Sequence, residues 1–149
     1  MAAKTIALWF QGNWREENAG HVPKRSGIYV VYECSLNAPP QTVALSLPKT
    51  VTLRQIIYVG EAGDVNDRVA KHEKWPKWRQ YCGKGNEICF SFAAVNGPDR
   101  ARGEAALIYR HQPPANDQYK DTFPFDETTM FLEGETGLLE SIFVVERDE

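Results

Sequence analysis

Hydrophobic residues along the chain gather into short runs that polar, glycine-rich or proline-rich segments separate. Six of these runs are rich in β-branched and aromatic residues, which favours strands. They are residues 5–10, 27–34, 56–59, 88–95, 128–133 and 138–146. Residues 5–10 have the character of an edge strand. The last two runs flank Gly-Glu-Thr-Gly and predict a hairpin.

Two segments carry the end signals of helices. Asp64 is suited to cap a helix that begins at residue 65, and Pro76 is expected to end or kink it near residue 75. A short second turn would follow, as far as Tyr81. The second helix is predicted over Asp99–His111, and the Pro113-Pro114 pair ends it.

The connections are less regular. Residues 11–25 are predicted to be a polar connection. Residues 35–55 form a long excursion that contains Pro39, Pro40 and Pro48. Within it, residues 42–47 have the composition of an extra strand. This insertion would contact substrate, a partner or nothing at all.

The order of these elements predicts an α+β fold. We expect a small central sheet, mainly antiparallel, with a three-stranded core that can be extended and with helices on its flanks. The whole chain, 1–149, is predicted to be a single domain. Its core would span about residues 26–116, with an N-terminal strand in residues 1–25 and an acidic hairpin in residues 117–149 as additions.

Composition narrows the class of protein. The chain has 149 residues with 42% hydrophobic and 25% charged content, which is typical of a soluble globular domain. No apolar run approaches the roughly 20 residues of a membrane span. The N-terminus lacks the apolar run of a signal peptide, and Cys34, Cys82 and Cys89 are not closely spaced. We therefore expect a cytoplasmic protein with reduced thiols, no zinc site and no membrane partner.

The net charge of −3 is unevenly distributed. Residues 1–116 contain 15 Lys and Arg against 10 Asp and Glu, a net +5, and residues 117–149 contain 2 against 10, a net −8. A basic face in the first part would attract phosphates. The acidic part would point elsewhere, cover that face, or form an ordinary solvated surface.

The stretch over residues 56–72 carries the strongest sign of chemistry. It predicts a strand, a turn that contains Gly60 and Gly63, and the start of a helix. Arg68 and His72 are four residues apart, so they share a helical face near the strand that carries Tyr58. A permanent cation and a titratable ring would thus lie beside a phenol.

The residues of this stretch and of the strand before it resemble the GIY-YIG nuclease family. Gly27-Ile28-Tyr29 matches the first family motif, and Tyr58-Val59-Gly60 matches the second with Val in place of Ile. Arg68, Glu104 and Asn116 follow in the order of the family's helix arginine, metal-binding glutamate and late asparagine. The resemblance covers roughly residues 26–116. It implies a three-stranded sheet flanked by helices, and a nuclease activity.

The resemblance also implies roles for individual residues. Tyr29, Tyr58, Arg68, His72 and Glu104 would be catalytic, and Glu104 would bind Mg²⁺ or Mn²⁺. Tyr29 would be a base or a proton relay. Without the resemblance, the two tyrosines are better explained as sheet residues and Arg68 as a solvated helix arginine. His72 is then nearly as well explained as a surface residue, and Glu104 equally well as a carboxylate at the rim of a helix.

Spacing adds two structural expectations. Side chains alternate along a strand, so Tyr29 should share a face with Val31, and Tyr58 with Ile56. Antiparallel pairing of the two strands would then bring both hydroxyls to one cleft. Glu104 lies three or four residues from apolar positions of its helix, so its carboxylate should be partly buried and in need of a partner. One carboxylate with waters and substrate oxygens is a normal Mg²⁺ shell.

A basic and aromatic cluster follows the first helix. Such residues can follow a phosphate backbone and stack on bases, although tryptophans three apart equally anchor a core. The predicted nucleic-acid-binding residues are Lys71, Lys74, Trp75, Lys77, Trp78, Arg79 and Asn116.

The sequence therefore predicts a divalent-metal-dependent endonuclease that hydrolyses phosphodiester bonds, with DNA as the expected substrate. Specificity would come from the insertion, the termini, a homodimer or a partner protein. The alternative is a non-catalytic GIY-YIG-like module that binds a nucleic acid or a protein partner, which the negative net charge favours.

Overall fold

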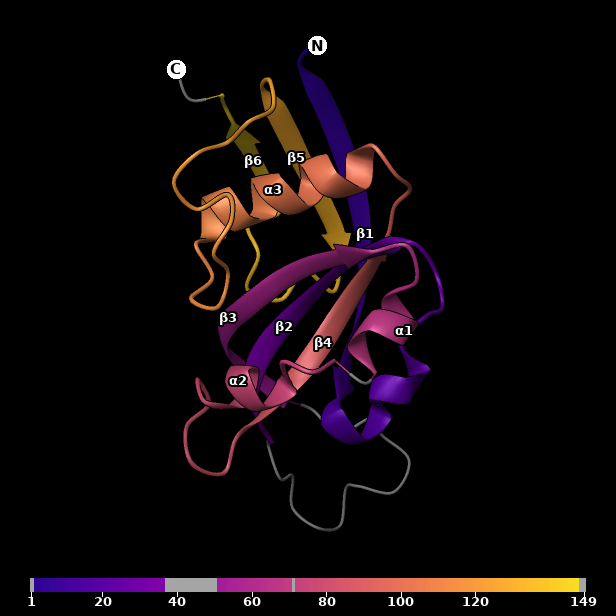
Figure 1. Cartoon of the computed structure of the whole chain (residues 1–149), viewed down its shortest axis with the longest axis vertical. Helices are drawn as coiled ribbons and strands as arrows, with labels where there is room; N and C mark the ends of the chain where they lie inside the picture. Colours follow the sequence, from indigo (N-terminus) through magenta and orange to yellow (C-terminus); the bar gives the residue numbers. More distant parts are fainter. Residues whose placement is uncertain (1, 37–50, 71, 148–149) are drawn as a thin grey trace.

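The computed structural model describes residues 2–36, 51–70 and 72–147. Within them one six-stranded sheet, curled into a half-barrel, forms the body of the protein (Figure 1). Its strands are β1 (Lys4–Arg15), β2 (Gly27–Leu36), β3 (Val51–Ala62), β4 (Glu87–Ala94), β5 (Thr128–Gly134) and β6 (Ile142–Val145). The helices are a 3₁₀ helix η1 (Glu16–His21), α1 (Val65–Val69), α2 (Trp75–Arg79) and α3 (Asp99–His111).

The strand order is β3-β2-β4-β1-β5-β6, and β1 and β5 are the parallel pair in an otherwise antiparallel sheet. The prediction of a small three-stranded core flanked by helices is therefore wrong. The N-terminal strand is not an edge strand: β1 lies between β4 and β5 and joins the C-terminal hairpin to the strands of the motifs. Local hydrophobic patterns identified these strands but carried no information on this long-range pairing.

Several element bounds also differ from the predictions. The β1 strand continues to Arg15, and a 3₁₀ helix follows, so residues 11–25 are not simply a connection. The helix after Asp64 is only five residues long. Pro76 does not end it but lies in the first turn of α2, where the missing amide donor is not needed. The extra strand expected over residues 42–47 lies outside the described residues.

Three other local predictions, on the cap at Asp64, the bounds of α3 and the C-terminal hairpin, are confirmed. The Asp64 side chain accepts a hydrogen bond from the backbone amide of Asp67 at 3.0 Å, so it caps α1. Helix α3 has the predicted bounds, and β5 and β6 pair as the expected antiparallel hairpin. Cys34, Cys82 and Cys89 are free. No helix in the described part of the chain is both long and apolar enough to cross a membrane.

The sheet has a hydrophobic cluster on each face. Helix α3 packs on the first cluster, which contains Ile28, Val30 and Val59. Helices η1, α1 and α2 pack on the second, which contains Tyr29 and Val31. Strand β3 is at one edge of the sheet and runs between α3 on one side and α1 and α2 on the other (Figure 1). Three helices therefore meet the motif strands near this edge.

Candidate active site

Tyr29 is fixed across the two motif strands. It pairs directly with Gly60 of β3, and its ring covers that glycine. A Cβ atom at position 60 would lie 2.3 Å from the Tyr29 ring carbon that bears the hydroxyl, a distance that no packed side chain allows. Only 1% of Tyr29 is exposed. Gly60 is thus needed for Tyr29 to lie across β3, which gives the glycine of the second motif a physical purpose.

A β-bulge brings Tyr58 to the same face. Val31 pairs with Tyr58 and Tyr32 pairs with Ile56, so Ile57 is the extra residue on β3. Tyr58 therefore faces Tyr29 and Val31, whereas Ile56 packs on the opposite face. The expectation that Tyr29 shares a face with Val31 is confirmed. The expectation that Tyr58 shares one with Ile56 is wrong, because the bulge interrupts the alternation.

Arg68 joins this pair from helix α1. The charge of its guanidinium lowers the pKa of Tyr29, so the two groups lie close together. The phenol rings of Tyr29 and Tyr58 have centroids 6.1 Å apart. If the Tyr29 hydroxyl accepts from Arg68, its own hydrogen is available to the Tyr58 oxygen, and the Tyr58 hydrogen remains for a group in the site. The three residues are thus placed to form a directed chain of donors.

Burial keeps both phenols neutral. Loss of solvent raises the pKa of Tyr29 far above its ordinary value, and the neighbouring Tyr58 raises it further, against the opposing effect of Arg68. Burial and the carboxylate of Glu104 raise the pKa of Tyr58 as well. Of the two predicted roles for Tyr29, the geometry therefore favours a proton relay over a free tyrosinate base.

Glu104 approaches the same place from helix α3. Its side chain is half-buried, as predicted, and burial and the nearby Glu61 carboxylate raise its pKa to about 7. Glu61 itself is bound to Arg100, with 2.5 Å between Arg100 Nε and Glu61 Oε1. In the described residues Glu104 has no such ion pair, although Arg68 and Arg100 are near enough to lower its pKa in part.

These features suit a divalent cation at Glu104. A partly buried carboxylate without a matched cation is destabilising, and a metal ion would neutralise it. Among the residues that the structure describes, no group of three or more His, Cys, Asp or Glu side chains is placed to hold a metal. Glu104 would therefore bind the ion together with water and phosphate oxygens, a shell that Mg²⁺ commonly accepts.

His72 lies beside this group with a defined tautomer. Its Nδ1 accepts a hydrogen bond from the backbone amide of Lys74 at 3.0 Å, so Nε2 carries the proton in the neutral ring. The ring packs on Trp78 with 4.6 Å between centroids. Its Nε2 is buried and lacks a partner in the described structure. Burial and Arg68 lower the pKa of His72, so the ring is a neutral donor near pH 7.

The predicted nucleic-acid-binding cluster divides into separate parts. Trp78 is fully buried between Tyr58 and His72, and Trp75 donates from Nε1 to the carbonyl of Val69 at 2.9 Å. Both tryptophans thus act as anchors for α2. Arg79 is bound to Glu16, at 2.6 Å from Nη2 to Oε1, and lies over the Trp75 ring.

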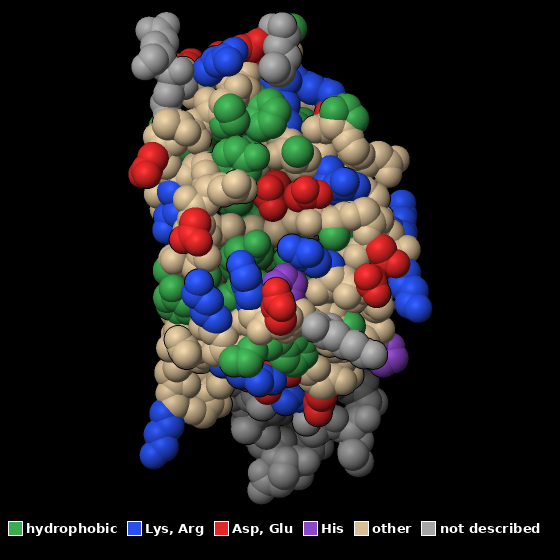
Figure 2. Space-filling view, in the orientation of Figure 1, with side chains coloured by type: hydrophobic (Ala, Val, Ile, Leu, Met, Phe, Trp, Pro, Cys, Tyr) green, Lys and Arg blue, Asp and Glu red, His purple; other side chains and the backbone are tan. Residues whose placement is uncertain are grey.

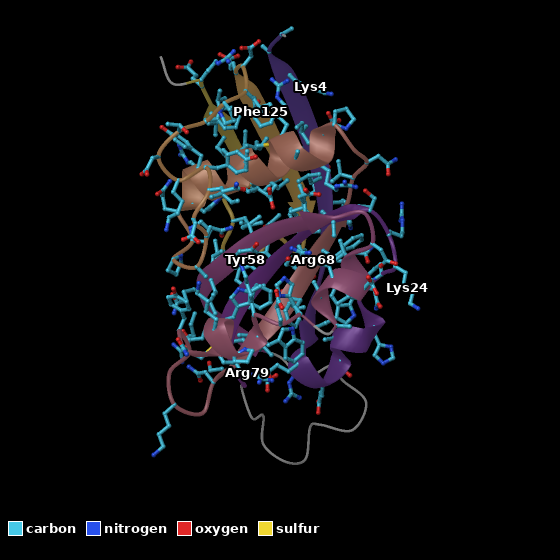
Figure 3. The ribbon with its side chains drawn as sticks, in the orientation of Figure 1. Lys4, Lys24, Tyr58, Arg68, Arg79 and Phe125 are labelled. Carbon is cyan, nitrogen blue, oxygen red and sulfur yellow. The ribbon has the colours of Figure 1, made fainter. Side chains whose placement is uncertain are left out.

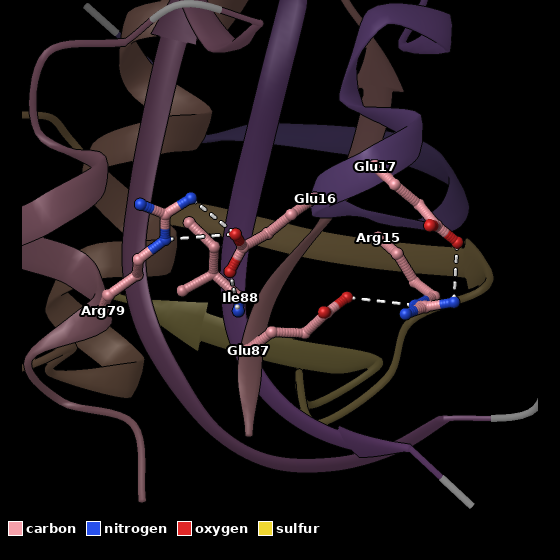
Figure 4. A network of polar contacts seen from close by, with 6 residues as sticks. All are labelled: Arg15, Glu16, Glu17, Arg79, Glu87 and Ile88. Carbon is pink, nitrogen blue, oxygen red and sulfur yellow. Dashed lines mark hydrogen bonds and ion pairs between the residues drawn. The ribbon is translucent and has the colours of Figure 1, made fainter. Parts of the chain in front are cut away.

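Arg79 belongs to a larger structural network (Figure 4). Glu16 accepts hydrogen bonds from Arg79 and from the backbone amide of Ile88, and Arg15 binds both Glu17 and Glu87. This network ties η1 to β4 and α2. It explains Arg79 without a ligand, so we assign Arg79 a structural role.

The predicted lysines differ in position. Lys74 is exposed and lines the hollows on both sides of it, one with Arg68 and His72 and one with Tyr58 and Glu104. Lys77 is exposed on α2. Lys71 lies outside the described residues.

Asn116 holds a loop on the edge of the sheet. Its side-chain oxygen accepts from the amide of Val59 and its side-chain nitrogen donates to the Val59 carbonyl, each at 2.9 Å. The amide of Ala115 donates to the Ile57 carbonyl at 3.0 Å. Both groups of the Asn116 amide are therefore used on the open edge of β3. Its function in the structure is to position the loop rather than to contact a ligand directly.

The surface shows where these residues converge. Tyr58 and Arg68 lie close together over β3, below α3 (Figure 3). Acidic side chains, basic side chains and a histidine gather on this face, in the space between α3 and α1 (Figure 2). The hollow around Arg68, of about 590 Å³, also contains the Asp64 cap, Asp67 and Glu73. The face is thus mixed in charge and is not a continuous basic track.

Sequence reasoning missed several residues of this region. The bulge at Ile57 has no signal in the local pattern. The pair of Glu61 and Arg100 depends on contact between β3 and the start of α3, 39 residues later. Asp117 and Gln118 line the hollow with Glu104, and their one signal in the sequence is that they directly follow Asn116.

Comparisons with protein-family models, with curated proteins and with solved structures found no match to this chain.

Proposed function

We propose that this protein is a divalent-metal-dependent endonuclease of the GIY-YIG type that hydrolyses phosphodiester bonds. One observation carries the proposal. Four separate segments bring an arginine, two neighbouring phenols and a partly buried carboxylate to the same edge of the sheet. A fold does not need this set, because in the described residues neither Arg68 nor Glu104 forms an ion pair.

Each residue supplies one requirement of hydrolysis. Arg68 offers a fixed positive charge and planar donors to the phosphate. Mg²⁺ or Mn²⁺ held by Glu104 would oppose the extra negative charge that the phosphate acquires. His72 lines the same hollow as Arg68 as a neutral ring, with its Nε2 buried. Stabilising developing charge is a large catalytic contribution, so loss of Glu104 or Arg68 should slow cleavage strongly.

The two phenols can carry the proton. The attacking water must lose one proton, and the leaving oxygen must gain one. Tyr29 can accept the proton of water as it passes its own to Tyr58, and Tyr58 can pass its hydrogen to the leaving oxygen. Each phenol gains one proton as it loses one, so neither becomes a tyrosinate, which the raised pKa values of both disfavour.

A cleavage assay tests the proposal directly. Plasmid DNA, single-stranded DNA and structured RNA would be incubated with the protein and Mg²⁺ or Mn²⁺, and the products resolved on gels. We expect cleavage of at least one substrate, loss of it in EDTA, and a loss of more than tenfold in Glu104→Gln, since about 1.4 kcal/mol is already tenfold in rate. Glu87→Gln, in the structural network, is the matched control and should retain activity.

Binding without cleavage by the wild-type protein would support the alternative, a non-catalytic module. A Glu104→Gln protein with more than a tenth of wild-type activity would contradict the role assigned to Glu104.

A further inference from the structure

A second hollow lies beside Tyr58, between α3 and the loop that follows it. This recess has a volume of about 240 Å³, and its lining includes Tyr58, Glu104, Ile108, Ala115, Asp117 and Gln118. The larger hollow around Arg68 adjoins it, because Lys74 lines both. A ligand held by Arg68 and Glu104 would therefore extend naturally into the recess.

Beyond Glu104 and the ion that it would hold, the recess is unfavourable for a phosphate. Asp117 adds a carboxylate there, and Lys74 is the single cation among the lining residues. The phosphate of a bound strand therefore belongs between Glu104 and Arg68, which lines the adjoining hollow. The part of a nucleotide that remains for the recess is the neutral part.

The walls suit a flat, partly apolar group. Ile108 and Ala115 are buried and give an apolar surface. The Tyr58 ring is held from behind by Trp78, with 5.1 Å between centroids, so it offers a rigid aromatic surface. Aromatic and apolar walls of this kind bind nucleobases by stacking, with about 1–3 kcal/mol per base.

The polar rim is held in place but its side chains are available. Asp117 and Gln118 follow Asn116, whose amide is fixed to Val59 by two hydrogen bonds. Both side chains are exposed, and in the described structure neither has a hydrogen bond or an ion pair. A carboxylate accepts hydrogen bonds only, so Asp117 favours a base with an exocyclic amino group, such as cytosine.

We propose that this recess binds one unpaired nucleobase next to the phosphate that is cleaved, with preference for an amino-bearing base. The inference rests on the proposed function and names its substrate class. A base inside a duplex cannot enter, because its partner occupies the edge that Asp117 and Gln118 would contact. The substrate is therefore a strand with an unpaired or extruded nucleotide.

Binding in EDTA tests the inference independently of cleavage. The probes are one labelled duplex in four forms: fully paired, with one unpaired cytosine, with one unpaired thymine, and with an unpaired abasic site. Fluorescence anisotropy would give each affinity. We expect the unpaired cytosine to bind about 5- to 150-fold more tightly than the abasic site, from the stacking contribution, and more tightly than thymine.

Variants at the polar rim test whether Asp117 causes the preference for cytosine over thymine. Asp117→Asn should bring the cytosine-to-thymine ratio close to one, whereas Asp121→Asn, which removes the same charge from an exposed site outside the recess, should leave the ratio unchanged. The ratio cancels the general effect of a lost negative charge.

The outcomes separate the two proposals. Equal binding of the unpaired cytosine and the abasic site would contradict the base-binding role of the recess, and so would cleavage of the fully paired duplex as fast as that of the duplex with an unpaired cytosine. Neither result would contradict the endonuclease proposal. A preference for the unpaired cytosine without cleavage of any form in Mg²⁺ would support the recess and contradict the endonuclease.

Discussion

Two charged clusters of this protein are built in opposite ways. In the network of Figure 4, Arg15 binds Glu17 and Glu87 at 2.8 and 3.0 Å, and the carboxylate of Glu16 is shared between Arg79 and a backbone amide. Around Tyr29, Arg68 lies near a neutral phenol, and Glu104 has a raised pKa and no ion pair in the described residues. The charges of the first cluster are paired within the protein, whereas Arg68 and Glu104 of the second form no ion pair in the described residues.

The difference indicates which cluster has a ligand. A charge that meets its opposite within the protein has a sufficient structural explanation. A partly buried charge without an opposite charge nearby is destabilising. Its position therefore points to an external group that neutralises it. The two clusters also show that basic and aromatic composition does not identify a binding surface: Arg79 and Trp78 looked suitable in the sequence and are structural in the fold.

Removal of the Tyr29 hydroxyl should give the largest change. Tyr29→Phe keeps the ring over Gly60, so stability should hardly change, while loss of the proton relay should slow single-turnover cleavage by about 10²–10⁴-fold. Substrate affinity, measured separately, should stay near that of the wild type. Cleavage at the wild-type rate would make Tyr29 a sheet residue and leave the relay without support.

Truncation of one arginine from each cluster compares them directly. Arg68→Ala should weaken binding and lower the cleavage rate, together by roughly 10²–10³-fold, because a fixed charge is lost from the phosphate site. Arg79→Ala should leave both within about twofold and reduce the free energy of unfolding by about 1 kcal/mol or less. Arg68→Lys should restore binding better than rate, since the ammonium lacks the planar fork.

The same effect from both alanine variants would remove the distinction between the clusters. Affinity, single-turnover rates and urea unfolding curves on the three proteins are sufficient to decide.

A smaller effect is expected from the glycine under Tyr29. Gly60→Ala places a Cβ against the ring and should destabilise the fold by about 1–3 kcal/mol. Gly97→Ala is the control, because no atom lies within 4 Å of its added Cβ, and its effect should stay within about 0.5 kcal/mol. Urea unfolding of both variants measures this. A Gly60→Ala protein as stable as Gly97→Ala would show that Tyr29 does not lie across β3.

How far the sequence could predict the molecule depends on the range of each interaction. The cap at Asp64, the bounds of α3 and the partial burial of Glu104 follow from neighbours on the same helix, and they were predicted. The placement of β1 between β4 and β5, and the bulge at Ile57, depend on pairing with distant strands. Antiparallel pairing of the strands that carry Tyr29 and Tyr58 was expected, but the bulge, not simple alternation, produces the shared face of the two tyrosines.

The pH dependence of stability reports on Glu104 itself. Its pKa is about 7 in the folded protein and near 4.5 when unfolded. Between these values the folded chain holds a proton that the unfolded chain releases, so the contribution of Glu104 to stability falls as pH rises through this range. Below about pH 4.5 the carboxyl is neutral in both states. Above about pH 7 its full cost, of order 1–3 kcal/mol, is present.

The stability of Glu104→Gln relative to the wild type therefore tests most directly whether this charge awaits a ligand. Urea unfolding would be measured in metal-free buffer at pH 5 and pH 8, and again at pH 8 with Mg²⁺. At pH 8 without metal we expect the variant to be more stable by about 1–3 kcal/mol, with a smaller difference at pH 5, and we expect Mg²⁺ to stabilise the wild type alone. A variant that is less stable than the wild type at pH 8, with no response of either protein to Mg²⁺, would show that the carboxylate of Glu104 already has its partner within the fold.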